Sequence, residues 1–335
     1  MESTIGKNII MTVSGGSHED SVNVKIKGIP KGIPIDFGEL NAFLARRAPG
    51  SSPCSTPRKE ADLPVFLQGF SGNITNGEPV MAIIKNTNTR SADYKPNLPR
   101  PSHADFTAFI KYGSQVNMSG GGPFSGRMTA PMCIAGGIAL QILKAKGVTI
   151  QAEIHSIGKI TGGPHMLDEI IQAKARKDSI GGIVECSVLG LPAGLGGPMF
   201  DGVESKLAAL LFGIPAVKGV DFGAGFEASS MYGSEHNDAF YMDGKSVKTR
   251  TNNHGGILGG ITSGMPLTLK VAFKPTPSIG IPQETVNLTE GIDTIIKIEG
   301  RHDPCVVPRA VPVVEALAAI GILDLFLEEE SIKWI

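Results

Sequence analysis

Cysteine is scarce in this chain, and its spacing excludes two classes of protein. Cys54, Cys133, Cys186 and Cys305 lie far apart and form no C-x-x-C pair. Zinc sites and disulfide frameworks both need cysteines at short, regular spacings, so four isolated ones predict free thiols. We therefore expect no metal in the functional site.

Long hydrophobic runs and excess charge are lacking as well. No uninterrupted apolar stretch reaches the roughly 18 residues that span a bilayer, and no signal-peptide pattern opens the chain. The formal net charge is -1, which gives no whole-molecule field to attract nucleic acid or a lipid surface. These absences predict a cytoplasmic enzyme without nucleic-acid or membrane partners, in which local arginines bind any anion.

Three common catalytic motifs are also absent, whereas glycine is abundant. The sequence has no G-x-x-x-x-G-K-[ST] loop, no G-x-S-x-G elbow and no H-E-x-x-H helix. Its 43 glycines in 335 residues are about 13%, nearly twice the usual ~7%. Glycine lets backbone approach a ligand closely, so glycine-rich loops are the places to look for a site.

The second half of the chain repeats patterns of the first half. An alternating strand pattern, a turn with Gly and Pro, and an apolar helical pattern occupy residues 22–44 and recur at 182–211. Gly28 opens the turn in the first copy, and Gly190 opens it in the second. The order of elements is the same in both places.

Two further pairs follow in the same order. Ile74 and Ile261 each begin a similar turn that leads into a strand, and Arg127 and Arg309 each open a long apolar helix. The offset between Ile74 and Ile261 differs from the offset between Gly28 and Gly190, as a single insertion between the two pairs would cause. Pairs that recur in order indicate an internal duplication. The site is then expected between the two halves.

This duplication predicts the fold class. We expect an α+β protein, an internally duplicated β-α-β layered sandwich with helices flanking antiparallel sheets. The prediction is a single domain over residues 1–335, with pseudo-symmetric halves of about 1–150 and 151–335. Short segments interrupted by Pro and Gly argue against a doubly wound parallel sheet.

Histidines in two loops are candidate proton donors. His18 follows a Ser-Gly-Gly-Ser stretch, and His103 lies in Arg-Pro-Ser-His-Ala-Asp. An imidazole near its ordinary pKa of about 6.5 can give or take a proton at neutral pH. The alternative for each is a capping histidine bonded to backbone. In Gly300–Pro304 an arginine, a histidine and an aspartate are consecutive, and the alternative there is a surface salt-bridge turn.

Anion-binding groups accompany these histidines. A glycine loop at Gly120–Gly122 leads to Arg127 just before a helix, and Asn252–Gly260 is a second glycine tract. Backbone N–H groups and guanidinium forks bind phosphate and carboxylate. Arg47 ends a predicted helix, where a basic residue is more often a complement to the helix dipole. The residues alone predict an anion site with two histidines and name no substrate.

At these positions the chain resembles the chorismate synthase family from Gly6 to about Leu327. The matching stretches follow the family's order: Gly16–His18, Arg46–Gly50, Thr56–Asp62, Arg90–Tyr94, Arg100–Asp105, Gly120–Gly122, Ser125–Arg127, Leu191–Gly196, Ile214–Gly219, Gly255–Gly260, Lys274–Thr276 and Gly300–Cys305. The resemblance implies a lyase of the shikimate pathway, which serves aromatic amino acid biosynthesis. Such an enzyme removes phosphate from 5-enolpyruvylshikimate 3-phosphate by 1,4-elimination and needs reduced FMN without net redox change.

The resemblance also implies residue roles. His103 would protonate or stabilise the reduced flavin, His18 would protonate the leaving phosphate, and Asp303 would help remove the ring proton through the flavin N5. Ser17 and Ser125 would support these steps. The implied flavin contacts are Ser125, Pro215, Ala216, Gly259, Lys274, Pro275, Thr276, Pro277, Ser278 and Arg301, and the implied substrate contacts are Arg47, Arg127 and Arg301.

Partners follow from the resemblance too. It implies a homotetramer and a flavin reduced by an external protein, because the family match leaves no room for a reductase domain. Pro53 stands where many members have an arginine assigned to the nicotinamide nucleotide, NADP, of bifunctional members. Pro123 and Phe124 replace polar residues of the family's flavin loop. The alternatives are a non-catalytic paralogue that binds flavin or an anion, and a phosphosugar or nucleotide enzyme on a related layered fold.

Overall fold

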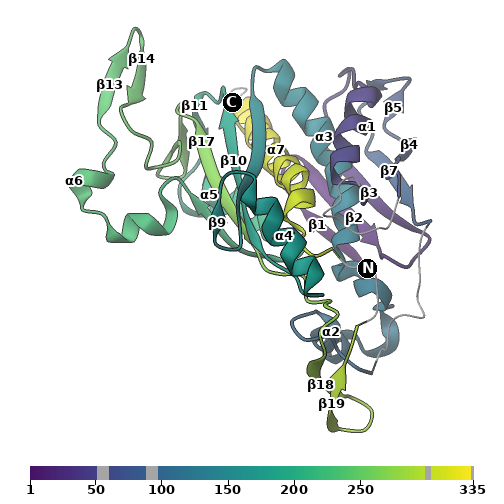
Figure 1. Ribbon diagram of the computed structural model, residues 1–335. Helices are drawn as coiled ribbons and strands as arrows, with labels where there is room; N and C mark the ends of the chain where they lie inside the picture. The colour runs from purple at the N-terminus through teal and green to yellow at the C-terminus, as the bar shows by residue number, and fades with distance from the viewer. Residues whose placement is uncertain (51–59, 88–96, 299–302, 333–335) are drawn as a thin grey trace.

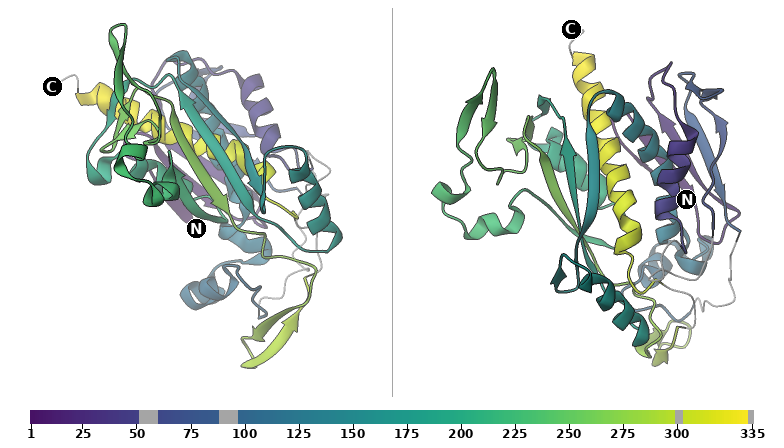
Figure 2. Two further views of the ribbon diagram at one scale, coloured as in Figure 1. Left: turned by 60° about the vertical axis from the view of Figure 1, so that its left-hand side comes forward. Right: turned by 45° about the horizontal axis from the view of Figure 1, so that its top comes forward.

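The structure, a computed structural model, describes residues 1–50, 60–87, 97–298 and 303–332. Two five-stranded antiparallel sheets enclose a layer of helices (Figures 1 and 2). The first sheet has the order β1-β2-β3-β7-β4, and the second has the order β12-β17-β10-β8-β9. Their bounds are β1 Glu2–Ile5, β2 Ile10–Gly15, β3 Ser21–Lys27, β4 Val65–Gln68, β7 Val80–Lys85, β8 Thr149–Ile157, β9 Ile160–Thr161, β10 Gly182–Leu189, β12 Val217–Phe222 and β17 Leu267–Phe273.

The helical layer consists of α1 (Phe37–Arg47), α3 (Thr129–Ala145), α5 (Val203–Leu211) and α7 (Val307–Ile332). Helix α3 packs on β2, β3 and β7, whereas α7 packs on β8 and β10, and the two helices pack along each other. Each strand that faces this layer alternates buried and partly exposed residues, so one face of each sheet is apolar. The main core therefore lies between the sheets.

Smaller elements surround this core. They are β5 (Phe70–Ser71) with β6 (Ile74–Thr75); β11 (Ala193–Gly196) with β16 (Ile261–Ser263) and β15 (Ile257–Leu258); β13 (Phe240–Asp243) with β14 (Ser246–Thr249); β18 (Gln283–Asn287) with β19 (Ile292–Ile296); and the helices α2 (Asp105–Tyr112), α4 (His165–Ala175) and α6 (Gly233–His236). Residues 224–253, which carry α6, β13 and β14, project from the body as an arm (Figure 1). The β18-β19 hairpin and α2 lie together at the opposite end.

Strand register shows the duplication. Val22 of β3 faces Ile84 of β7, and Val184 of β10 faces Val271 of β17. The step along the chain from Val22 to Val184 equals the step between the two glycines that open the repeated turns. Likewise, the step from Ile84 to Val271 equals the step between the two isoleucines that begin the second repeat. The paired strands of the two sheets are thus in equivalent register, and the fold class predicted from the sequence is confirmed.

A pair of threonines makes the same hydrogen bonds in each half. Thr75 Oγ1 donates to the Pro30 carbonyl and accepts from the Ile33 N–H. Thr262 Oγ1 bonds the Pro192 carbonyl and the Leu195 N–H in the same way. Both threonines are buried. These bonds fix the turn that follows the first strand of each repeat. The division near residue 150 stays a prediction.

Two helices are long and apolar enough to cross a membrane by length and composition alone. They span Gly126–Ala145 and Val307–Glu329, and most of each is buried inside the protein. Helices packed between two sheets must be apolar on nearly every side, so burial accounts for their composition.

Candidate active site

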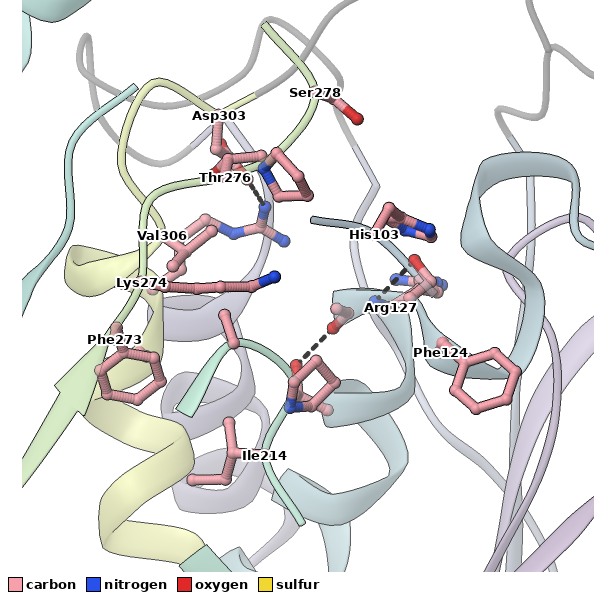
Figure 3. Close-up of a pocket in the computed structure, with 18 of the residues that line it drawn as sticks. His103, Phe124, Arg127, Ile214, Phe273, Lys274, Thr276, Ser278, Asp303 and Val306 are labelled. Atoms are coloured by element: carbon pink, nitrogen blue, oxygen red, sulfur yellow. Dashed lines mark hydrogen bonds and ion pairs between the residues drawn. The ribbon is translucent and has the colours of Figure 1, made fainter. Parts of the chain in front are cut away.

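A cavity of about 390 Å³ lies where both halves contribute to one wall. It is bounded by the C-terminal end of α1, the glycine loop before α3, the start of α7 and the segment after β17 (Figure 3). The volume is within the 300–1,000 Å³ typical of small-molecule sites. Segments from both halves thus share one site.

Two glycines separate the two candidate histidines. A Cβ at Gly120 would collide with His18 Nε2, and a Cβ at Gly121 would lie 3.1 Å from His103 Nε2. Both glycines have positive φ, 63° and 90°. Any larger residue would crowd an imidazole, so this loop needs glycine in order to hold the rings on its two sides. His103 and Gly120 line the cavity, and His18 lies behind Gly120.

His103 is held by its neighbours in the Arg-Pro-Ser-His-Ala-Asp stretch. Its Nδ1 lies 2.7 Å from Asp105 Oδ1 and 3.1 Å from Arg100 Nη2. Arg100 also donates to both carboxylate oxygens of Asp105, at 2.7 and 2.8 Å. Burial alone would raise the pKa of Asp105, but the hydrogen bonds and charges of Arg100 and His103 hold it well below its usual range.

Arg47 and Arg127 meet at a buried carboxylate. Each donates from Nη1 to Asp62, whose side chain is fully buried. Arg127 also pairs with Glu60 at 3.4 Å, and its Nε donates to Asn86 Oδ1 at 2.9 Å. Burial would raise the pKa of Asp62, yet the charges of both arginines outweigh it and lower that pKa.

The two consecutive arginines at the end of α1 have separate tasks. Arg46 makes a two-pronged ion pair with Glu315 of α7, at 2.6 and 3.0 Å. Arg47 instead turns inward, where its Nε donates to Thr129 Oγ1 at 3.0 Å. Arg46 therefore ties α1 to α7, and Arg47 lines the cavity.

Asp303 enters the cavity from the start of α7. Arg309 Nη1 donates to its Oδ2 at 2.5 Å, and Arg309 Nε donates to the Arg47 carbonyl at 3.0 Å. Burial lowers the pKa of Arg309, and the nearby charge of Arg47 lowers it further. The ion pair fixes the carboxylate of Asp303 in the wall that faces His103 across the cavity (Figure 3).

The segment after β17 supplies the remaining polar wall. Lys274 extends across the cavity floor and donates to the Ser102 carbonyl (Figure 3). Burial lowers the pKa of Lys274, and Lys218 lowers it further. Thr276 Oγ1 is buried and has no hydrogen-bond partner in the described protein. A buried hydroxyl without a partner is costly unless a ligand satisfies it, so this segment is suited to holding a polar group.

The charges of the described lining favour an anionic ligand. Arg47, Arg100, Arg127, Lys274 and Arg309 line the cavity. Four carboxylates accompany them, Glu60 and Asp303 in the lining and Asp62 and Asp105 paired to the arginines, which leaves an excess of one cation. Phe124, Phe273, Ile214 and Val306 add apolar surface. The cavity can therefore hold a ligand that combines a flat apolar part with several negative charges.

Most of the predicted site residues lie in the cavity wall: His103, Asp303, Ser125, Pro215, Ala216, Lys274, Thr276, Pro277, Ser278, Arg47 and Arg127. Ser17 and His18 lie next to Gly120, behind the wall. Gly259 lies in the turn between β15 and β16 and does not line the cavity, nor does Pro275. Arg301 lies outside the described residues.

Sequence reasoning did not assign five residues of this site: Glu60, Asp62, Arg100, Asp105 and Arg309. Four of them lie inside stretches that carried the family resemblance, and Arg309 marked the start of the last helix. The signal that could have identified four of them was the presence of charged residues within the stretches that resemble the family. Asp62 pairs with Arg127, 65 residues away, so that ion pair left no local pattern. Arg100 with Asp105 and Asp303 with Arg309 are only five and six residues apart.

Comparison with known proteins decides the family. Residues 9–327 match the family model described as chorismate synthase. The chain belongs to the chorismate synthase family. A chorismate synthase of Chitinophaga pinensis is 46% identical over 329 residues, which cover 98% of this chain and 97% of the relative. One of Dehalococcoides mccartyi is 43% identical over 353 residues, covering 98% and 97%.

A solved structure extends the comparison to the fold. The chain resembles a crystal structure of chorismate synthase with a TM-score of 0.75 and 25% identity, covering 97% of this chain and 93% of the other. The family predicted from the sequence is confirmed, and with it the predicted enzyme class, a lyase that forms chorismate. The comparisons do not favour a non-catalytic paralogue.

Proposed function

We propose that this member of the chorismate synthase family converts 5-enolpyruvylshikimate 3-phosphate to chorismate and phosphate with reduced FMN. The observation that carries the proposal is a single cavity in which His103, Asp303 and five cationic side chains face one another. A substrate with two carboxylates and a phosphate can leave water only where several cations replace its hydration. The substrate in this proposal is a small molecule.

The residues present fit a flavin. Phe124 offers aromatic surface to a flat ring system, and Lys274 can meet a phosphate. The Thr276 hydroxyl, buried without a partner, can donate to a ring or ribityl oxygen. When bound, reduced FMN supplies electron density to the substrate transiently, with no net redox change. Ser125, Pro215, Ala216, Lys274, Thr276, Pro277 and Ser278, which line the cavity, are the proposed contacts. Gly259 and Pro275, which do not line it, and Arg301, outside the described residues, stay expectations of the family resemblance.

Side chains of the protein are the proposed donors and acceptors of the protons. His103 is the proposed donor on the cavity side of the glycine loop, and His18, with Ser17, the donor to the departing phosphate. Asp303, fixed by Arg309, is the proposed acceptor for the ring proton. General acids and bases must lie within hydrogen-bond reach of their protons, so His18 requires the substrate to lie against Gly120.

Substrate anions are assigned to Arg47, Arg127 and Arg301. The guanidinium groups of Arg47 and Arg127 already share Asp62, which holds them side by side. Arranged donors stabilise developing negative charge without reorganising when the bond breaks. This pair can therefore stabilise the leaving phosphate as its charge grows.

Phosphate release tests the proposal. The wild type should release phosphate from 5-enolpyruvylshikimate 3-phosphate under anaerobic conditions with chemically reduced FMN. His103→Ala and Asp303→Ala should each lose on the order of 100-fold or more in rate. His165→Ala is the matched control, because His165 is exposed on α4. If the wild type binds reduced FMN but releases no phosphate, the chain is a flavin-binding paralogue.

The proposal also covers how the flavin is reduced and in which compartment the protein lies. We assign flavin reduction to a separate protein rather than to NADPH bound by this chain. Pro53, the position that bears on nucleotide binding, lies outside the described residues. Cys133 and Cys186 are buried thiols, and burial raises the pKa of Cys133 to about 12. Unoxidised thiols agree with a reducing compartment, the cytoplasm. Comparing turnover with chemically reduced FMN and with NADPH plus oxidised FMN tests whether a separate protein must reduce the flavin.

A further inference from the structure

We propose that Asp105 is the positioning residue that fixes the proton of His103 on Nδ1, and that Arg100 locks Asp105 in place. The catalytic consequence of this proposal rests on the role of His103 in the proposed function, whereas the hydrogen bonds among the three side chains do not depend on that role. In this role Asp105 acts through His103 and does not need to contact a ligand.

His103 Nδ1 has a hydrogen-bond acceptor and a donor beside it. Asp105 Oδ1, an acceptor, lies 2.7 Å away, and Arg100 Nη2, a donor, lies 3.1 Å away. Arg100 Nη2 has a better partner in Asp105 Oδ1, at 2.8 Å. An aspartate with a lowered pKa accepts and does not donate. The Nδ1 must therefore carry a hydrogen, which it donates to Asp105.

Arg100 locks this arrangement from the opposite side. Its Nε and Nη2 form a two-pronged pair with Asp105, and its backbone N–H donates to Asp105 Oδ2 at 3.0 Å. Its Nη1 donates to Ser278 Oγ at 3.2 Å, which joins the network to the second half of the chain. The side chains of Arg100, His103 and Asp105 are mostly buried. The carboxylate therefore has little freedom to turn away.

The consequence concerns Nε2, which lies beside Gly121 on a ring that lines the cavity. With Nδ1 committed to Asp105, Nε2 is the nitrogen that exchanges its proton within the cavity. Without the carboxylate, Arg100 Nη2 would remain as a donor to Nδ1, which would have to become an acceptor. A neutral ring would then carry its hydrogen on Nε2, the opposite tautomer.

Solid-state 15N NMR of protein labelled at the histidine ring nitrogens tests this, because it reports which nitrogen bears hydrogen whatever the size of the assembly. His103→Gln assigns the signal. In the wild type without ligand, His103 should show a protonated Nδ1, and Asp105→Ala should show a bare Nδ1. The matched control is Asp168→Ala, which removes the same kind of partner, at 3.1 Å, from the exposed His165 and should leave the His103 signal unchanged.

A bare Nδ1 in the wild type would overturn the proposal before any variant is made. So would an Asp105→Ala protein that keeps the wild-type signal. In turnover, Asp105→Ala should lower kcat by on the order of 100-fold with little change in flavin affinity. If the 15N result holds but the wild type releases no phosphate, the positioning inference stands and the proposed function fails.

Discussion

Phe124 stands where the family resemblance leads us to expect a polar residue of a flavin loop. Its ring lines the cavity, is 36% exposed and lies 6.4 Å from the ring of Tyr112. A polar residue at this place could bond a ligand directly, whereas phenylalanine offers apolar area. Phe124 therefore offers this cavity an apolar surface on which a flat ligand could stack.

Replacing that ring should weaken flavin binding. In Phe124→Ala the lost apolar contact of a partly exposed aromatic side chain corresponds to about 1 kcal/mol, or roughly a fivefold higher Kd for FMN. Flavin fluorescence titration measures it. Phe226→Ala, on the arm and 82% exposed, is the control and should not change the Kd. An unchanged Kd in Phe124→Ala would show that the ring does not touch the flavin.

Asp62 should govern how the protein responds to acid. Its lowered pKa means that its contribution to stability is present above the unfolded value of about 3.9 and is lost as pH falls below it, through the folded pKa. Asp62→Asn leaves Arg47 and Arg127 buried without their shared carboxylate, which costs about 3–5 kcal/mol at pH 7. Urea unfolding of the wild type and Asp62→Asn at pH 7, 5, 4 and 3 should show this difference in the free energy of unfolding and its decrease below pH 4.

The control for acid unfolding is Asp168→Asn, because Asp168 is exposed and its loss should change stability little. If Asp62→Asn and the wild type lose stability in parallel down to pH 3, the carboxylate does not make the expected contribution.

At the scale of elements, the sequence predicted most of what positions the site. Alternation predicted β3 and β10, and the repeats predicted that the second half copies the order of elements in the first. The pairing of β3 with β7 and of β10 with β17 came from the structure, where the repeat offsets match the register. Local pattern could not show that the helices lie between the sheets, because an apolar helix looks the same whether one or two sheets cover it. Nor could it show that Asp62 joins Arg47 to Arg127, since that contact depends on tertiary packing.

Close packing between α3 and α7 leads to a prediction about glycine. A Cβ at Gly136 would overlap the Ala316 Cα, which is backbone and cannot move aside. Gly136→Ala should therefore destabilise the protein by about 2 kcal/mol or more, as overpacked cores do. Gly233→Ala in α6 is the control, because its nearest neighbour there is 4.0 Å away. Thermal unfolding of the two variants makes the comparison.

Equal melting temperatures for the two glycine variants would contradict the packing argument. A lower melting temperature for Gly136→Ala alone would show that the helices meet at backbone distance. The cavity walls supplied by α1, the loop before α3 and the start of α7 depend on that contact for their spacing.

For the whole molecule, the arm of residues 224–253 lacks a core of its own. Phe226, Tyr232, Phe240 and Met242 are 82%, 78%, 64% and 64% exposed. So much exposed apolar area on one projecting segment is typical of an interaction surface. It agrees with the homotetramer that the family resemblance implies, in which the arm would reach onto a second copy.

The arm gives the tetramer a direct test. Light scattering should find four chains of 35.1 kDa in the wild type, and Phe240→Asp with Met242→Asp should give smaller species, because burying two carboxylates in an apolar interface is costly. Phe212→Asp is the control: Phe212 is 54% exposed but lies outside the arm, and its variant should stay tetrameric. A wild-type monomer would exclude the tetramer, and a tetrameric arm variant would place the interface elsewhere.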